Sequence, residues 1–242
     1  MSSRITKTIS SNLKTIYNLA LPTTNKLFQL GVDEVARGCF VGPVVSACVI
    51  LDIPYLQSLS KEEIHLIPRI ADSKKLKPEQ RQVAEKWIKE KGSLAYGIGL
   101  GSVEEIDDMN IREANFLAMN RAISNCLKQL RIKQRFSSKD IYLLVDGNAF
   151  TIKPEFEKEL GLVQWETLIK GDDKDLSIAC ASILAKEYRD AYLDDLVKND
   201  RKLKAYDWHK NRGYGTKDHM KLILQNGVTH HHRLTFLKKM LN

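Results

Sequence analysis

The sequence has no run of about 18 apolar residues, the length that a helix needs to cross a bilayer. No secretory signal is visible, and the four cysteines form no C-x-x-C pair, which argues against a zinc site. The residues beside the cysteines are small or apolar, so buried free thiols in a reducing compartment are expected. These absences favour a cytoplasmic protein with no membrane partner.

The first 27 residues lack acidic side chains, and the first acid of the chain is Asp33. They contain Arg4, three lysines and several Ser and Thr residues, a composition that overlaps with organelle transit peptides. Residues 13–21 could instead form a short docked helix. We therefore interpret residues 1–27 as an N-terminal extension, either a targeting segment or a short helix.

The rest of the composition is that of a basic globular protein. The chain has 242 residues, which fits one large domain with a substantial core. Lys and Arg number 38 against 30 acidic residues, a formal net charge of +8. This charge suits a polyanionic partner such as nucleic acid, although it is equally compatible with a role in solubility alone.

The order of expected strands and helices predicts an α/β fold with a mixed sheet flanked by helices. Turn residues and apolar spacing divide residues 28–200 from a helical C-terminal part, residues 201–242. Strands are expected over 27–34, 41–51, 94–100, 141–145 and 163–169. Helices are expected over 78–92, after the Ser102 capping box, over 110–130, over 174–197, and twice after about 217.

Acidic residues follow three of the expected strands: Asp33 and Glu34, then Asp146, then Asp172. Strand ends of this kind meet at one edge of an α/β sheet. Four carboxylates gathered there would repel one another, and a hard divalent cation, Mg²⁺ or Mn²⁺, would relieve the repulsion. Each acid also has a structural explanation, as a turn residue or a helix cap. Asp33 and Glu34 can share a site only if the strand twists or ends there, since neighbours on a strand face opposite sides.

The expected helix 174–197 carries small residues and two cations along one stripe, from Asp175 through Ser182 to Lys186 and Arg189. Such a stripe could lie beside a phosphate backbone, or it could be a half-buried packing strip. The three histidines at 230–232 suggest a metal site at first sight, but a structural role or a phosphate contact is favoured.

An ordered set of motifs resembles the type 2 ribonucleases H, specifically ribonuclease HII. The match covers roughly residues 28–236 and is specific because the motifs occur in order. They are Gly31–Gly38 (GVDEVARG), Val41–Val45 (VGPVV), Asp72–Leu76 (DSKKL), Leu144–Gly147 (LVDG), Lys170–Asp172 (KGD), Ser177–Lys186 (SIACASILAK) and His209–Thr216 (HKNRGYGT).

The resemblance implies a ribonuclease H-like fold with a C-terminal helical extension. It also implies hydrolysis of RNA in RNA–DNA hybrids, and of duplex DNA at embedded ribonucleotides, with two Mg²⁺ or Mn²⁺ ions and with 5′-phosphate and 3′-hydroxyl ends as products. Carried over by position, the four metal ligands are Asp33, Glu34, Asp146 and Asp172. Separately from the resemblance, a monomer is the default expectation, since nothing in the sequence suggests an oligomer interface.

The same resemblance assigns a substrate-binding set. Ala36, Arg37 and Gly38 match a loop whose backbone contacts 2′-hydroxyl groups, the groups that distinguish RNA from DNA. The family has Gly at the position of Ala36 in this chain, and a Cβ there disfavours positive φ. The substitution therefore bears on the preference for RNA–DNA junctions and not on catalysis itself. Tyr214 matches a tyrosine that packs on a deoxyribose. The expected phosphate contacts are Lys74, Lys75, Lys186 and Arg189.

Three alternatives fit parts of the pattern. Ribonuclease HIII carries a separate N-terminal platform domain, for which about 27 residues are too few, and Arg37 favours HII. A resolvase-like or integrase-like nuclease would lack the 2′-hydroxyl loop and the tyrosine. A non-catalytic nucleic-acid-binding module would be favoured by loss of any of the four carboxylates, and all four are present.

Overall fold

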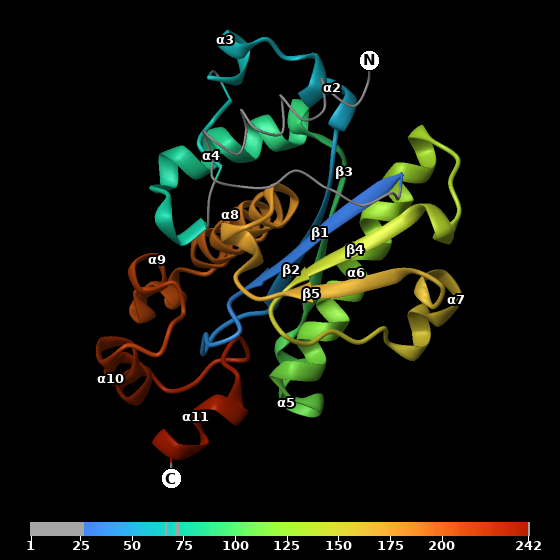
Figure 1. The fold of residues 1–242 in the computed structure, drawn as a ribbon. Helices are drawn as coiled ribbons and strands as arrows, with labels where there is room; N and C mark the ends of the chain where they lie inside the picture. The colour runs from blue at the N-terminus through green and yellow to red at the C-terminus, as the bar shows by residue number, and fades with distance from the viewer. Residues whose placement is uncertain (1–26, 66, 71–72, 242) are drawn as a thin grey trace.

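A computed structural model of the chain describes residues 27–241, apart from positions 66, 71 and 72. Five strands form one mixed sheet in the order β3-β2-β1-β4-β5 (Figure 1). β1 pairs antiparallel with β2, and β2 antiparallel with β3, whereas β4 and β5 run parallel to β1. The expected mixed α/β sheet is confirmed. The strands are β1 (Phe28–Val35), β2 (Val44–Leu51), β3 (Ser93–Gly101), β4 (Ile141–Asp146) and β5 (Gln164–Leu168).

Two long helices, one on each face, bury the middle of the sheet (Figure 1). α6 (Ile111–Lys133) packs against β3 and β2, and α8 (Leu176–Asn199) packs against β1 and β2. β2 is buried at every position because it lies between both helices. The helices approach so closely that a Cβ at Gly31 would overlap the Ser177 backbone, and one at Gly99 would overlap Ala118. Gly97 and Gly99 of β3 leave the space that α6 needs for this close approach.

Most expected helix signals are confirmed. The Ser102 side chain accepts a hydrogen bond from the Glu105 N–H at the start of α5, and Asn110 caps α6. α8 begins at Leu176 and is capped by Asp175, so the alternative of Asp172 as its cap is wrong. The shorter described helices before α8 include α2 (Ile53–Ser58), α3 (Lys61–Ile64), η1 (Ser73–Lys75), α4 (Pro78–Trp87), a π-helical turn (Ile88–Gly92), α5 (Val103–Met109), α7 (Glu157–Leu160) and η5 (Gly171–Asp173).

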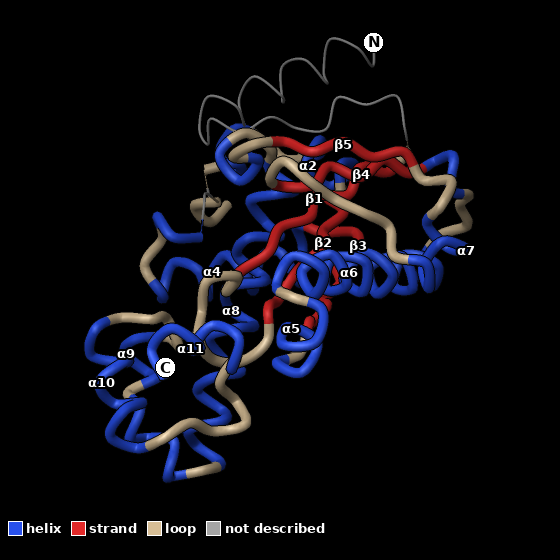
Figure 2. Tube along the Cα trace, turned by 90° about the horizontal axis from the view of Figure 1, so that it is seen from below, coloured by secondary structure: helices blue, strands red, loops and turns tan. Residues whose placement is uncertain are grey.

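The C-terminal helices lie together near the C-terminal end of α8 (Figure 2). Trp208, fully buried, packs with Val41 and Leu193 in a small core that joins these helices to α8 and to the chain after β1. In the described residues no helix has both the length and the apolarity required to span a bilayer. The C-terminal elements are η6 (Arg201–Tyr206), α9 (Trp208–Asn211), α10 (Lys217–Asn226) and α11 (Leu234–Leu241). The N-terminal extension lies outside the described residues except for Leu27.

Candidate active site

Three adjacent strands bring the four acids to one edge of the sheet. The parallel register of β1 and β4 ends at Val32 and Val145, so Asp33 and Asp146 follow the last pair side by side. Asp146 is still paired with Leu168 of β5, and Asp172 follows four residues later in η5. The clustering of strand ends that the sequence predicted is therefore present.

Asp33 and Glu34 lie on opposite sides of the sheet, because β1 continues as a strand to Val35. Asp33 faces α8 and is 5% exposed, with Ser182 near its carboxylate. Burial, and then the charges of Glu34 and Asp146, raise the pKa of Asp33 well above its ordinary value. Glu34 faces α6. Burial raises the pKa of Glu34, and the charge of Arg37 opposes this shift, since Glu34 Oε1 lies 3.1 Å from Arg37 Nη1. Because Asp146 raises the pKa of both acids, it lies within electrostatic reach of each.

A cavity of about 400 Å³ opens on the α6 side of this edge, with Glu34, Asp146 and Asn115 in its lining. Glu34 Oε2 is buried there and has no hydrogen-bond partner among the described residues. Two of the other carboxylates are held by backbone N–H groups: Asp146 Oδ1 accepts from the Gly171 N–H at 2.6 Å, and Asp33 Oδ1 accepts from the Glu34 N–H at 2.6 Å. In the described part of the chain no three acidic, His or Cys side chains are already spaced as a metal cluster. An all-oxygen set of ligands that includes the unpartnered Glu34 Oε2 nevertheless fits a hard cation.

A second feature lies beside the acids, where the chain leaves β1. Ala36 has φ of +68°, and the Cys39 N–H donates to its carbonyl at 3.3 Å to close a turn. Arg37 and Gly38 are exposed at the tip. The Phe40 N–H donates to the Gly213 carbonyl at 2.7 Å, which places this turn against the segment that carries Tyr214, a residue 40% exposed. We call residues 36–42 the 36–42 loop.

Replacing Ala36 by glycine is expected to leave stability unchanged or raise it, because the left-handed conformation costs a non-glycine residue about 1–2 kcal/mol. The matched control is Ala191→Gly, an exposed position within α8, where the same change should cost about 1 kcal/mol. Urea unfolding of both variants measures the difference. Equal destabilisation by the two changes would contradict the strained conformation of Ala36.

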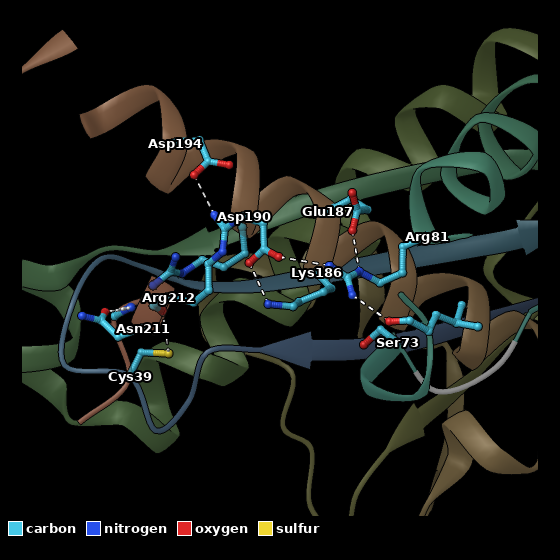
Figure 3. A network of polar contacts seen from close by, with 12 residues as sticks. Cys39, Ser73, Arg81, Lys186, Glu187, Asp190, Asp194, Asn211 and Arg212 are labelled. Atoms are coloured by element: carbon cyan, nitrogen blue, oxygen red, sulfur yellow. Dashed lines mark hydrogen bonds and ion pairs between the residues drawn. The ribbon is translucent and has the colours of Figure 1, made fainter. Parts of the chain in front are cut away.

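The expected phosphate-contact cations occupy different environments. Lys186 is 15% exposed and lies one helical turn beyond Ser182, with Nζ 2.7 Å from Asp190 Oδ1 (Figure 3). Lys75 forms an ion pair with Asp173, next to Asp172, and Lys74 is exposed beside it on η1. Arg189, by contrast, is 2% exposed, and its Nη2 donates to the Val41 carbonyl at 2.7 Å. A buried guanidinium cannot meet a phosphate at the surface, so the assignment of Arg189 as a phosphate contact is corrected to a support for the 36–42 loop.

The stripe on α8 is mostly a packing strip, since Asp175, Ala179 and Ser182 are all buried. Of the three histidines at 230–232, His232 has a structural role, one of the two roles favoured from the sequence, whereas His230 is exposed. His232 is 1% exposed, its Nδ1 accepts from the Thr229 N–H at 2.9 Å, and burial lowers its pKa to about 4. His219 accepts from Trp208 Nε1 at 3.1 Å in the same small core.

Several residues of the site were not predicted from the sequence. Asn115 is 3% exposed beside Glu34, and its Oδ1 has no partner among the described residues. It stands out as a polar residue inside an otherwise apolar stretch of α6, a signal that could have identified it. Arg81 of α4 donates to Glu187 at 2.5 Å and to Asp190 at 3.3 Å (Figure 3). Asp190 is also the acid that pairs with Lys186, so Arg81 and Lys186 share a partner. Both acids are more than 100 residues away from Arg81 in sequence, so no local pattern indicates the contact.

Comparison with known proteins agrees with these features. A family model described as Ribonuclease HII matches residues 30–240. The Ribonuclease HII of Bacteroides thetaiotaomicron is 42% identical over 219 residues, which cover 90% of this chain and 94% of the relative. That of Wolbachia pipientis subsp. Culex pipiens is 40% identical over 208 residues, covering 85% of this chain and 88% of the relative.

Solved structures support the fold. Ribonuclease H2 from Pyrococcus horikoshii OT3 superposes with a TM-score of 0.58 at 21% identity, covering 88% of this chain and 96% of that chain. Bst-RNase HIII in complex with Mn²⁺ has a TM-score of 0.58 at 16% identity, covering 85% and 72%. With the family model matching most of the chain and relatives near 40% identity, the chain belongs to the ribonuclease HII family of ribonuclease H enzymes.

Proposed function

We propose that this protein hydrolyses the RNA strand of RNA–DNA hybrids and also cuts 5′ of single ribonucleotides embedded in duplex DNA, leaving 5′-phosphate and 3′-hydroxyl ends. Membership of the ribonuclease HII family supports the hybrid activity. The observation that carries the proposal is the convergence of Asp33, Glu34 and Asp146 at one sheet edge, immediately before the 36–42 loop. This adjacency would place a cleavage centre next to backbone groups able to contact a ribose.

We propose Asp33, Glu34, Asp146 and Asp172 as the residues that would hold two divalent ions, Mg²⁺ or Mn²⁺. Support comes from the unpartnered Glu34 Oε2 and from the raised pKa values of Asp33 and Glu34, because a bound cation would offset both costs. When bound, such ions supply activation of water and neutralisation of charge on the scissile phosphate. The protein's own part would be to fix the carboxylates, through β1, β4 and the Gly171 N–H, at the positions where that charge develops.

Substrate recognition is proposed for exposed groups around this edge. The backbone of Ala36, Arg37 and Gly38 would contact 2′-hydroxyl groups, and the ring of Tyr214 would pack on the next deoxyribose. Lys74, Lys75 and Lys186 would contact phosphates. Through Tyr214, the helical residues 201–242 would act as a substrate-binding cap on the catalytic part, residues 28–200, and the protein would work as a monomer.

The test is cleavage of two labelled DNA duplexes, one with a single embedded ribonucleotide and one with four, in Mg²⁺, Mn²⁺ or EDTA. We expect cutting of both duplexes, on the 5′ side of the single ribonucleotide, and no cutting in EDTA. Cutting of the four-ribonucleotide duplex alone would contradict the proposed single-ribonucleotide activity and leave a hybrid nuclease. Cutting that persists in EDTA would contradict the metal assignment.

A further inference from the structure

The C-terminal segment holds the 36–42 loop from behind. The Arg233 N–H donates to the Phe40 carbonyl at 2.8 Å, and the Gly42 N–H donates to the His231 carbonyl at 2.8 Å. Val41 and His232 form an isolated antiparallel bridge between these two bonds. Residues 231–233 therefore act as a short partner strand for the outgoing half of the loop, although nearly 200 residues separate the two segments.

Two buried arginines add side-chain contacts to the same loop. Arg233 is fully buried, and its Nε donates to the Gly42 carbonyl at 2.8 Å while its Nη1 donates to the Arg37 carbonyl at 3.0 Å. Arg189 donates to the Val41 carbonyl from the α8 side. Of these three bonds, the one to Arg37 is the only one that reaches the tip of the loop, next to Gly38.

The bond to Arg37 fixes the direction of a peptide group. In a trans peptide the C=O of one residue and the N–H of the next point in opposite directions. Arg233 holds the Arg37 carbonyl toward the interior, so the Gly38 N–H points outward. Gly38 is exposed, and its N–H has no acceptor among the described residues. The geometry thus leaves one outward-pointing donor at the loop tip, next to Arg37, the residue that pairs with Glu34.

Stability alone does not explain these arginines. Among the described residues neither forms an ion pair, and Arg189 Nε, Arg189 Nη1 and Arg233 Nη2 are buried without partners. Burial, together with the nearby charge of Arg189, lowers the pKa of Arg233 to about 10. Two buried like charges that form no ion pair with a carboxylate cost free energy, and apolar side chains of similar volume are often at least as stabilising at such positions. What a guanidinium supplies here is the geometry of two donors to two loop carbonyls.

We propose that Arg233 is a positioning residue for ribose recognition: it orients the Arg37–Gly38 peptide so that the Gly38 N–H can donate to a 2′-hydroxyl oxygen of the substrate. This inference rests on the proposed function, because it assumes that the 36–42 loop contacts the ribose.

The test measures discrimination between two duplexes in EDTA, where no cleavage is expected. Fluorescence anisotropy gives the ratio of Kd for an all-DNA duplex to Kd for the same duplex with one ribonucleotide. We expect Arg233→Met to lower this ratio by about three- to tenfold, the affinity ratio of one hydrogen bond, with the Kd for all-DNA unchanged. Arg233→Lys keeps the charge and can reach one carbonyl, so it should lower the ratio less.

The matched control is Arg121→Met, which also removes a guanidinium bonded to a backbone carbonyl, that of Leu100 at 2.6 Å, but away from the 36–42 loop. It should keep the wild-type ratio. If Arg233→Met does not fold, the lysine variant decides. An unchanged ratio in folded Arg233 variants, or equal weakening of both duplexes, would overturn the inference while the wild type still discriminates. A wild-type protein that does not discriminate would overturn both this inference and the proposed recognition by the loop.

Discussion

Asp33→Asn and Asp146→Asn are each expected to abolish cleavage while leaving binding of an RNA–DNA hybrid largely intact. Both changes remove a negative charge from the sheet edge and preserve the shape of the side chain. Changes to groups that merely orient metal ligands cost about 10- to 100-fold in activity. Loss of a proposed ligand should therefore exceed about 100-fold in kcat/KM, measured on the four-ribonucleotide duplex.

The same two variants should be at least as stable as the wild type in EDTA. Burial, and then the charges of Glu34 and Asp146, raise the pKa of Asp33, so the ionised group costs folding free energy. An asparagine removes that repulsion and can still accept the hydrogen bond from the Glu34 N–H. Lost activity together with a retained or higher Tm would indicate that these acids are kept for chemistry at a cost in stability.

Asp52→Asn provides the matched control. Asp52 also follows a strand directly, but it lies after β2, at the opposite edge of the sheet, and caps α2. Asparagine is an equally good N-cap, so stability and cleavage should both stay at the wild-type level. Full activity in Asp33→Asn or Asp146→Asn, or equal loss in Asp52→Asn, would contradict the assignment of the metal ligands.

The acids could be predicted from the sequence because the signal is local. Each of Asp33 and Asp146 ends an apolar run of strand residues, and chain direction alone then brings parallel strand ends to one edge. Which side of the sheet each acid faces was not predictable, because it depends on where β1 ends. β1 continues past Glu34 and pairs with β2 up to Val35, so the two neighbouring acids point to opposite faces.

The stripe on α8 was the least accurate interpretation, and the reason is physical. Up to Ala185 this helix is small or apolar around its whole circumference, a pattern typical of a buried helix. A one-face interpretation therefore selected Arg189 as a surface cation, although it is buried. The contacts of Arg189 with Val41 and of Arg233 with Arg37 and Gly42 span 148 to 196 residues, a range at which periodicity and capping rules say nothing.

Ala36 illustrates a different limit. The sequence rules disfavour a positive φ for alanine, yet the loop adopts φ of +68° there. Local preference is overridden because the loop is fixed from outside, by Gly213 on one side and by residues 231–233 on the other. Departures from local rules are most common at functional sites, where surrounding contacts maintain the strain.

Arg81→Met is expected to destabilise the protein by about 3–5 kcal/mol, the usual cost of removing one partner from a buried ion pair. Arg81, 9% exposed, donates to Glu187 at 2.5 Å, to Asp190 at 3.3 Å and to the Leu76 carbonyl at 3.0 Å. Its loss would leave Glu187 buried without its partner, while Asp190 keeps only Lys186. Chemical denaturation measures the change in the free energy of unfolding.

Two further variants distinguish the two ways in which Arg81→Met could destabilise the protein, an unpaired buried charge and lost packing. Arg121→Met breaks a more exposed pair with Glu105, 38% and 26% exposed, and should cost no more than about 1 kcal/mol. The double variant Arg81→Met with Glu187→Met removes both members of the shorter of the two ion pairs that Arg81 forms. It should recover part of the lost stability, because no unpaired carboxylate then remains at position 187. A double variant as unstable as the sum of the two single variants would mean that Arg81 acts through packing and its bond to Leu76. Recovery of stability without recovery of hybrid cleavage would instead mean that Arg81, through Asp190, serves chiefly to hold Lys186 in place for the substrate.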